Sequence, residues 1–310
     1  MQAQWDAYRA PPPELHTEAP APDDDGFPGC FSKSSTVSVQ NKGVVQISEV
    51  DVRDPVLTAS GTYQQIYALA HKNSNNHNAT YTEREFLRIH TLQNFGSALE
   101  ITGEHLIYVM GKDYPVRADS VQVGDTLVSA IYESGARVTK IETIYRADGL
   151  YAPMSPDGTI IVNGIVSSCY VALQQYPKSA GNGQYVMFAD GESTGISQHT
   201  FAHMLLSPVR MACIGISSGV CDTFNDDGLA YFVQIGSAIT NFACQQSALV
   251  QRILFLLFVG VFGTLFTLEC VLGPTLSAFA IVIGLFAVAR RFLPVSAGAH
   301  GHTTAKTKQL

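Results

Sequence analysis

Two neighbouring residues near the start of this chain have the types needed for a backbone-cutting reaction. Cys30 follows Gly29 at the point where the Pro-, Ala- and Asp-rich residues 1–28 give way to a segment that alternates like β-structure. A cysteine sulfur at such a junction can attack the preceding carbonyl and convert the peptide bond into a thioester. A thiol with a pKa of about 8.5 is only slightly ionised at neutral pH, so the attack needs assistance.

The string Thr102-Gly103-Glu104-His105 can supply that assistance. It lies at a predicted turn that enters a strand, where a hydroxyl and an imidazole three residues apart can face one peptide bond. Histidine is well suited to give a proton to a departing nitrogen near pH 7. A twisted amide or developing oxyanion also needs fixed hydrogen bonds. Taken alone, a Thr-x-x-His string is more often an ordinary turn.

A series of short strands must position these residues. Alternation and β-branched or aromatic content predict strands between Thr36 and Val171, with turn signals such as Asn163-Gly164 between them. The predicted strands are Thr36–Val39, Val44–Ser48, Pro55–Ala59, Tyr63–Leu69, Phe86–Leu92, Ala98–Ile101, His105–Met110, Thr126–Tyr132, Val138–Tyr145 and Thr159–Val162. An internal repeat aligns Val50–Ala59 with Val121–Ala130 and indicates a β-fold built from two related halves, unless shared strand composition explains it.

A helical region is predicted after the strands. Gln198–Cys213 has the apolar spacing of a helix that Pro208 would kink or end. His199 and His203 form an i,i+4 pair in this segment. That spacing suits zinc, but no third ligand is evident, so a surface or core helix is the simpler interpretation.

The C-terminal segment is apolar enough for a membrane. Ile253–Leu272 has about 20 residues, which span a hydrocarbon layer of about 30 Å. Thr275–Ala289 adds a second apolar run after Gly273-Pro274. Two short spans forming a hairpin are the favoured arrangement, and one long kinked span is the alternative. A buried soluble hairpin is the third interpretation, and Glu269 is the acidic residue inside the apolar stretch.

Composition restricts the classes of function. The chain has 310 residues, a formal net charge of −7 and only 15% charged residues, and its basic residues form no patch, so nucleic-acid binding is not expected. Six cysteines without a Cys-x-x-Cys pair argue against a zinc ribbon or a thioredoxin-like motif. No cofactor and no metal are predicted. The first 30 residues contain no apolar run that would form a signal peptide, so either membrane entry depends on the C-terminal segments or the chain lacks its true start.

Together the motifs resemble those of the C-terminal autoprocessing domain of Hedgehog proteins, the Hog or Hint domain. Gly29-Cys30-Phe31-Ser32 is similar to that family's cleavage junction, and Thr102–His105 to its Thr-x-x-His block. The stretch Tyr151–Tyr170 is similar to its closing block. The resemblance covers about Gly29 to Val171. It implies an all-β Hint fold with pseudo-two-fold symmetry, in agreement with the internal repeat.

The resemblance also implies roles in cleavage. Cys30 would be the nucleophile of an N-to-S acyl shift at Gly29–Cys30, assisted by Thr102 and His105, with His105 as the acid on the leaving nitrogen. Cys169, in the closing block, would lie close to Cys30 and pair with it or modulate it, or it is a plain buried thiol.

One position departs from the family pattern. His71 stands where Hedgehog proteins have an aspartate that activates cholesterol for attack on the thioester. A histidine can still act as a base, so the acceptor is expected to be a sterol, water or another nucleophile. The alternative is a solvated loop histidine.

The sequence thus predicts five parts. These are a disordered Pro/Asp-rich leader (1–29), the Hint domain (30–175), a downstream region whose structure the sequence leaves open (176–248), one or two transmembrane helices (249–292) and a polar tail (293–310). The predicted function is self-cleavage, with the N-terminal segment as substrate and membrane lipid around the anchor, in the secretory pathway or at the cell surface. The alternatives are an inactive Hint-like membrane-tethered binding or structural module, and a metal-binding module that uses Cys30, His105 and Cys169.

Overall fold

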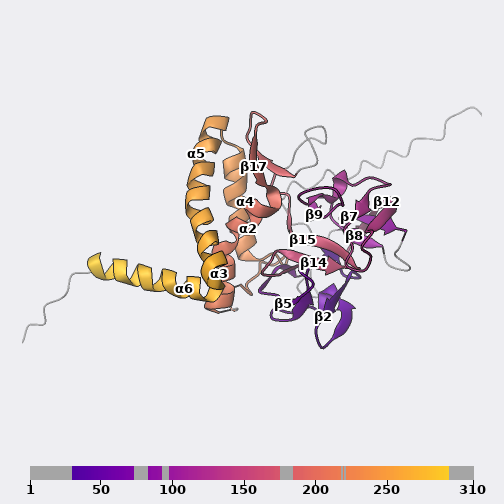
Figure 1. The fold of residues 1–310 in the computed structure, drawn as a ribbon, viewed down its shortest axis with the longest axis horizontal. Coiled ribbons are helices and arrows are strands. Elements are labelled where there is room, and N and C mark those ends of the chain that lie inside the picture. Colours follow the sequence, from indigo (N-terminus) through magenta and orange to yellow (C-terminus); the bar gives the residue numbers. More distant parts are fainter. Residues whose placement is uncertain are drawn as a thin grey trace, which may run out of the picture.

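A β-rich body and a group of helices stand side by side in this protein (Figure 1). The structure is a computed structural model, which describes residues 30–72, 83–92, 98–174, 184–217, 219 and 221–292. Gly29, the predicted leader and the predicted polar tail lie outside the described residues. The division into a Hint domain that ends at residue 175 and a downstream region stays a prediction.

A seven-stranded antiparallel sheet contains the residue after Cys30. Its strand order is β11 (Thr126–Leu127), β12 (Ala136–Arg146), β7 (Arg84–Thr91), β8 (Leu99–Ile101), β1 (Phe31–Ser32), β13 (Leu150–Met154) and β6 (Ala68–Lys72). The short strand β1 therefore lies between two neighbours, pairing Phe31 with Ile101 on one side and with Tyr151 on the other. This central place buries the start of the domain.

Two four-stranded sheets and a hairpin complete the β-structure. One sheet has the order β10 (Val116–Arg117), β9 (His105–Ile107), β15 (Ile165–Val171), β14 (Thr159–Val162). The other has the order β3 (Gly43–Gln46), β2 (Thr36–Val39), β4 (Pro55–Leu57), β5 (Tyr63–Gln65), and β16 (Tyr185–Met187) pairs with β17 (Ser193–Ser197). Short 3-10 helices, η1 (Ile47–Glu49) and η2 (Ala118–Ser120), each lead into one copy of the repeat. Fully buried side chains of the common core include Phe31, Phe86, Ile89, Leu99, Leu106 and Leu127.

The internal repeat is confirmed at the level of individual bonds. In both copies an aspartate carboxylate, of Asp54 or Asp125, accepts a hydrogen bond of 2.9 Å from the backbone N–H three residues earlier. The residue before each aspartate has a left-handed backbone, with φ of 77° at Arg53 and 99° at Gly124. The same turn therefore occurs twice, and the two copies lead into β4 and β11.

Two strands at the centre of the fold were not predicted from the sequence. All five residues of β13 and the first six of β15 are buried, so neither strand has the alternation of a half-exposed strand. β13 also contains Pro153, and the register with β6 shifts between Ala152 and Pro153, which is where a strand tolerates proline. The predicted strand Tyr63–Leu69 is divided between β5 and β6, which belong to different sheets.

The helical side begins with two short helices. The predicted helix Gln198–Cys213 is present as α2 (Gln198–Leu205) and α3 (Ser207–Gly215). Pro208 lies in the first turn of α3, where a missing N–H costs nothing, so it starts a second helix instead of kinking one. The helix α4 (Tyr231–Cys244) follows.

The apolar C-terminal region forms α5 (Ala248–Phe258), a π-helical turn η5 (Val259–Gly263) and α6 (Thr264–Phe292). Within the described residues this region contains one candidate membrane span by length and composition, Ala248–Phe286. The favoured hairpin of two spans is not formed. Gly273 has φ 76° and ψ 161°, and beyond this break the helix turns away from α5 instead of returning beside it (Figure 1).

Candidate active site

Cys30 and Thr102 contact each other through two hydrogen bonds. The backbone N–H of Cys30 donates to Thr102 Oγ1 at 3.0 Å, and the N–H of Thr102 donates to the Cys30 carbonyl at 3.1 Å. The pairing of β1 with β8 places them together, because Phe31 lies opposite Ile101. The nitrogen held by the Thr102 hydroxyl is the one that a cut between Gly29 and Cys30 would release.

His105 lies close to both Thr102 and β1. Its backbone N–H closes the predicted turn by donating to Thr102 O at 3.2 Å, and its buried ring packs 4.4 Å from the ring of Phe31. Its Nε2 is 2.7 Å from the carbonyl oxygen of Ser168. A carbonyl oxygen can only accept, so Nε2 carries a proton. Nδ1 is therefore the ring nitrogen whose protonation can change during a reaction.

The Cys30 thiol is fully buried. Burial raises its pKa well above the usual range, and the positive charge of Arg84 opposes this shift in part. The sulfur therefore rests as a thiol and has to give up its proton during an attack.

Cys169 is also a buried thiol, and burial raises its pKa to about 12. Its sulfur accepts a hydrogen bond of 3.5 Å from the backbone N–H of Ser155 and lies 3.5 Å from the Ser155 hydroxyl oxygen. It is not paired with Cys30 in this structure; the disulfide found among the described residues joins Cys213 and Cys221, a pair that sequence analysis missed. A role for Cys169 in cleavage stays a prediction.

His71 is a buried strand residue, so the interpretation as a solvated loop histidine is wrong. Only 3% of its surface is exposed, and its Nδ1 donates to the Leu150 carbonyl at 2.9 Å. Burial lowers the pKa of His71 to about 4, so the ring is neutral at pH 7 with its lone pair on Nε2.

Strand register relates His71 to the cysteine. His71 lies opposite Ala152 in the pairing of β6 with β13. Continuing the register of β13 with β1 by one residue places Cys30 opposite the other side of Ala152. Two strand spacings separate the backbones of Cys30 and His71, which corresponds to about 10 Å. Directly opposed residues point to the same face of a sheet, so their side chains share one face.

The histidine pair of α2 supports the closing strand. His199 Nδ1 is 2.9 Å from the Ser168 hydroxyl, and His203 Nδ1 is 2.6 Å from the Tyr170 hydroxyl. Burial lowers the pKa of His199 to about 4 and that of His203 to about 2, so both are neutral. Because Ser168 also accepts from His105, the helix α2 buttresses the strand segment that holds the imidazole. Sequence analysis noted both histidines but had no signal for their partners.

The metal-binding alternative finds no support in this arrangement. No group of three or more His, Cys, Asp or Glu side chains that could hold a metal ion occurs among the described residues. The three proposed ligands have other surroundings: the Cys30 thiol is buried at the start of β1, the His105 ring contacts Ser168, and Cys169 contacts Ser155.

Comparisons with known proteins agree with this fold. The sequence profile of the Hint module matches residues 21–178. The chain is 27% identical over 157 residues to Protein hedgehog of Drosophila melanogaster, covering 47% of this chain and 31% of that protein. It is 26% identical over 193 residues to the Tiggy-winkle hedgehog protein of Danio rerio, covering 59% of this chain and 40% of that protein. The matches thus span less than half the length of these curated relatives.

Solved structures of inteins are similar as well. The gp41-1 intein covers 45% of this chain and 98% of its own, with 18% identity and a TM-score of 0.36. A DnaB intein from Synechocystis sp. PCC 6803 covers 45% and 97%, with 12% identity and a TM-score of 0.37.

The profile match extends over half of the chain, and the chain therefore belongs to the Hint family of self-cleaving autoprocessing modules. Within that family it is of the Hedgehog type, as its motifs predicted. The predicted fold class is thereby confirmed: a mostly β Hint core followed by helices with one apolar candidate span.

Proposed function

We propose that this chain cleaves its own backbone between Gly29 and Cys30 by an N-to-S acyl shift. The observation on which this rests is the hydrogen bond from the Cys30 backbone N–H to Thr102 Oγ1, 3.0 Å long, in a site that also contains the His105 ring. A hydroxyl that accepts a hydrogen bond from this N–H fixes the position of the nitrogen that must leave. It also favours the pyramidal nitrogen through which an amide leaves.

Each group has one task in the proposed step. The Cys30 sulfur forms a bond to the Gly29 carbonyl carbon, and the bond from that carbon to the Cys30 nitrogen breaks. The thiol gives up one proton and the departing nitrogen needs one, so the step conserves protons. His105 Nδ1 takes up the proton that the thiol gives up and delivers it to the nitrogen, while Nε2–H stays on Ser168 O. The products are a thioester on Cys30 and its free amino group.

The second step is proposed to be hydrolysis assisted by His71. Its neutral ring can take a proton from an incoming water through Nε2, because Nδ1–H is held by the Leu150 carbonyl. Water is the acceptor that we propose, because the neutral His71 ring can serve as its base.

Cleavage would separate the first 29 residues from a remainder held at a membrane by the apolar C-terminal region. The alternative of an inactive tethered module is not favoured by any observation, since such a module would not need a cysteine, a hydroxyl and an imidazole around one peptide nitrogen.

The test is the mass of the purified full chain in detergent. Incubation with dithiothreitol or hydroxylamine, which attack thioesters, should release a fragment that ends at Gly29. Cys30→Ala should abolish the release, whereas Cys244→Ala, which removes an exposed thiol at the end of α4, should leave it intact. If wild type and Cys30→Ala release the same fragments, or neither releases any, the proposed chemistry is wrong. In the absence of thiol, cleavage in H₂¹⁸O should place the label in the new carboxylate, and an added sterol should not be incorporated.

A further inference from the structure

Gly273 divides the apolar C-terminal region into two helical parts with different surroundings. The left-handed backbone at Gly273, followed by Pro274, breaks the hydrogen-bonded helix, and α3 packs at the bend against the start of the second part. The first part, Ala248–Leu272, runs along the helices of the body. The second part, Pro274–Phe292, projects away from the body (Figure 1).

The inner side of the first part is bound to the body along its length. Phe258 stacks on Phe201 of α2 at 4.1 Å between ring centroids. Further along, Glu269 forms a buried two-pronged ion pair with Arg210 of α3, both contacts 2.8 Å long, and Arg210 also donates to the His203 carbonyl. A helix that crosses a membrane alone is surrounded by lipid on all sides. Because Ala248–Leu272 is attached to α2 and α3, it cannot be such a helix.

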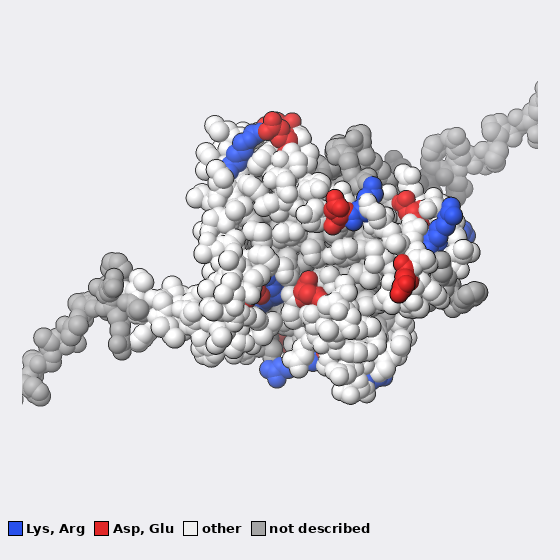
Figure 2. All heavy atoms as spheres, viewed as in Figure 1, with Lys and Arg blue, Asp and Glu red and all other residues white. Residues whose placement is uncertain are grey.

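The outer side of the first part is apolar and uncharged. Leu249, Leu256, Val261 and Val271 are among its exposed side chains. The cation of this part, Arg252, lies near the start of α5 and forms ion pairs of 2.7 Å with Asp190 and with Glu192. Figure 2 shows this outer surface white except for a group of charges at one end. An apolar outer face on a helix that stays attached to a protein fits the boundary between lipid headgroups and acyl chains.

The neighbouring helix α4 presents a similar stripe. Its exposed apolar residues recur every three or four positions, as on one face of a helix: Tyr231, Ile235, Ile239 and Phe242. The sequence from Gly228 to Gln251 contains no charged residue. Both helices of this side thus suit contact with a lipid surface.

The second part has the dimensions of a membrane span. Its uncharged run from Pro274 to Ala289 contains 16 residues, which at about 1.5 Å per residue extend about 24 Å. The arginines that follow have side chains of a length that can reach the headgroups, so a hydrocarbon layer of about 30 Å can be crossed with slight local thinning. Its described large apolar side chains from Phe279 to Val288 are exposed on successive turns. Arg290-Arg291 ends it, and Lys306 and Lys308 follow in the sequence. Such a cationic flank is typical of the cytoplasmic side of a span.

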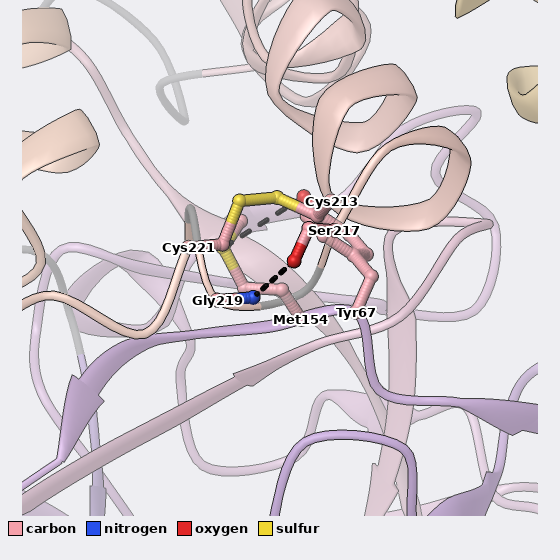
Figure 3. Close-up of a disulfide and its surroundings, with 6 residues drawn as sticks. All are labelled: Tyr67, Met154, Cys213, Ser217, Gly219 and Cys221. Carbon is pink, nitrogen blue, oxygen red and sulfur yellow. Dashed lines mark hydrogen bonds between the residues drawn. A yellow bond between two sulfur atoms is a disulfide. The ribbon is translucent and has the colours of Figure 1, made fainter.

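A disulfide indicates that the β-rich body lies on the side of the membrane opposite to this cationic flank. Cys213 at the end of α3 forms a disulfide with Cys221, and this bond lies against Tyr67 and Met154 of the β-rich body (Figure 3). Disulfides persist in oxidising compartments and are rare in the cytosol. The body, with Cys30, therefore belongs on the lumenal or external side, and the positively charged end on the cytoplasmic side.

We infer that the anchor works in two parts: Ala248–Leu272 lies flat on the non-cytoplasmic surface of a lipid bilayer, and Pro274–Phe292 crosses it with its end in the cytoplasm. The inference concerns attachment and orientation only, so it stands or falls separately from cleavage at Cys30.

Two matched double variants of the full chain test the division of the anchor. Ile283→Asp with Leu285→Asp introduces charges into the proposed span, and Leu256→Asp with Val261→Asp introduces them into the proposed surface helix. The four side chains are exposed by 67%, 65%, 71% and 57%, so neither pair disturbs internal packing. After expression in membranes and washing with alkaline carbonate, the first pair should move to the supernatant. The second pair should stay in the pellet with wild type.

Any other distribution overturns the inference. If only the second double variant left the pellet, Ala248–Leu272 would be the span. If both double variants stayed in the pellet, or both left it, the two parts would share the anchoring. Resistance of the β-rich body to limited proteolysis in detergent reports whether each variant is folded.

Protease protection tests the orientation. The full chain, with an epitope tag after Leu310, is inserted into sealed microsomes and protease is added outside. The tag should be removed and the β-rich body should be protected. A protected tag, or a digested body, would overturn the proposed orientation. The amount of fragment that begins at Cys30, measured in the same samples, shows separately whether cleavage occurs.

Discussion

The Thr102 hydroxyl offers the sharpest test of the proposed chemistry. Thr102→Val keeps the size and β-branching of the side chain but removes the acceptor 3.0 Å from the Cys30 nitrogen. Since Thr102 is only partly buried and makes this contact at the surface of the core, the substitution should cost little stability. Its effect should fall on the rate of the acyl shift.

The size of that effect follows from the state of the nitrogen. A hydrogen bond between neutral groups contributes about 0.5–1.5 kcal/mol, whereas one to a charged group contributes about 1.5–3 kcal/mol. The Cys30 nitrogen is neutral at the start and gains a proton as it leaves, so the contact strengthens along the reaction. The difference between the two contributions, about 1–1.5 kcal/mol, corresponds to a slowing of about 5- to 13-fold.

The assay is the release of the N-terminal fragment from purified full chain over time. Dithiothreitol is kept in excess so that thioester formation limits the rate. Thr102→Ser, which retains the hydroxyl, should react within a few-fold of wild type, and thermal unfolding should show that both variants are folded. A Thr102→Val variant as fast as wild type would refute the role of the hydroxyl. A Thr102→Ser variant as slow as Thr102→Val would instead point to packing as the cause.

Three further results are expected. His71→Ala should leave dithiothreitol-induced cleavage unchanged and slow spontaneous hydrolysis by about 10²-fold or more, as the loss of a general base does. Equal spontaneous rates in the variant and in wild type would exclude His71 as the general base. Arg210→Met leaves Glu269 buried without its cation and should destabilise the protein by about 3–5 kcal/mol, and adding Glu269→Leu should restore most of this in urea unfolding. The pKa of His71 and of His199 is about 4 in the folded protein, below the usual 6.5, so the unfolded chain binds more protons between these values. The stability that these neutral histidines contribute should therefore be fully present above pH 6.5 and be lost as the pH falls toward 4. In thermal scans His199→Gln should make the unfolding temperature less dependent on pH in this range. An unchanged dependence would contradict the assignment of His199 as a buried neutral histidine.

Local signals were sufficient for much of the fold. The repeat of Val50–Ala59 in Val121–Ala130 was found from identities alone, because the same turn requires an aspartate at the same place in both copies. Alternation located the half-exposed strands such as β2 and β7. It missed β13 and β15, because a strand buried on both faces has no alternation to detect.

The amino-acid sequence by itself determined the Thr-x-x-His turn and the family and predicted the junction at Cys30, since these depend on residue types and short spacings. Only the tertiary structure decided that His71 is buried in register with the cysteine, that His199 supports the strand holding His105, and that Glu269 is paired with Arg210. Those contacts join residues far apart in the chain. These contacts are set by the order of the strands and the packing of the helices. The residue type at one position of a single sequence does not indicate which distant residue will contact it in the folded protein.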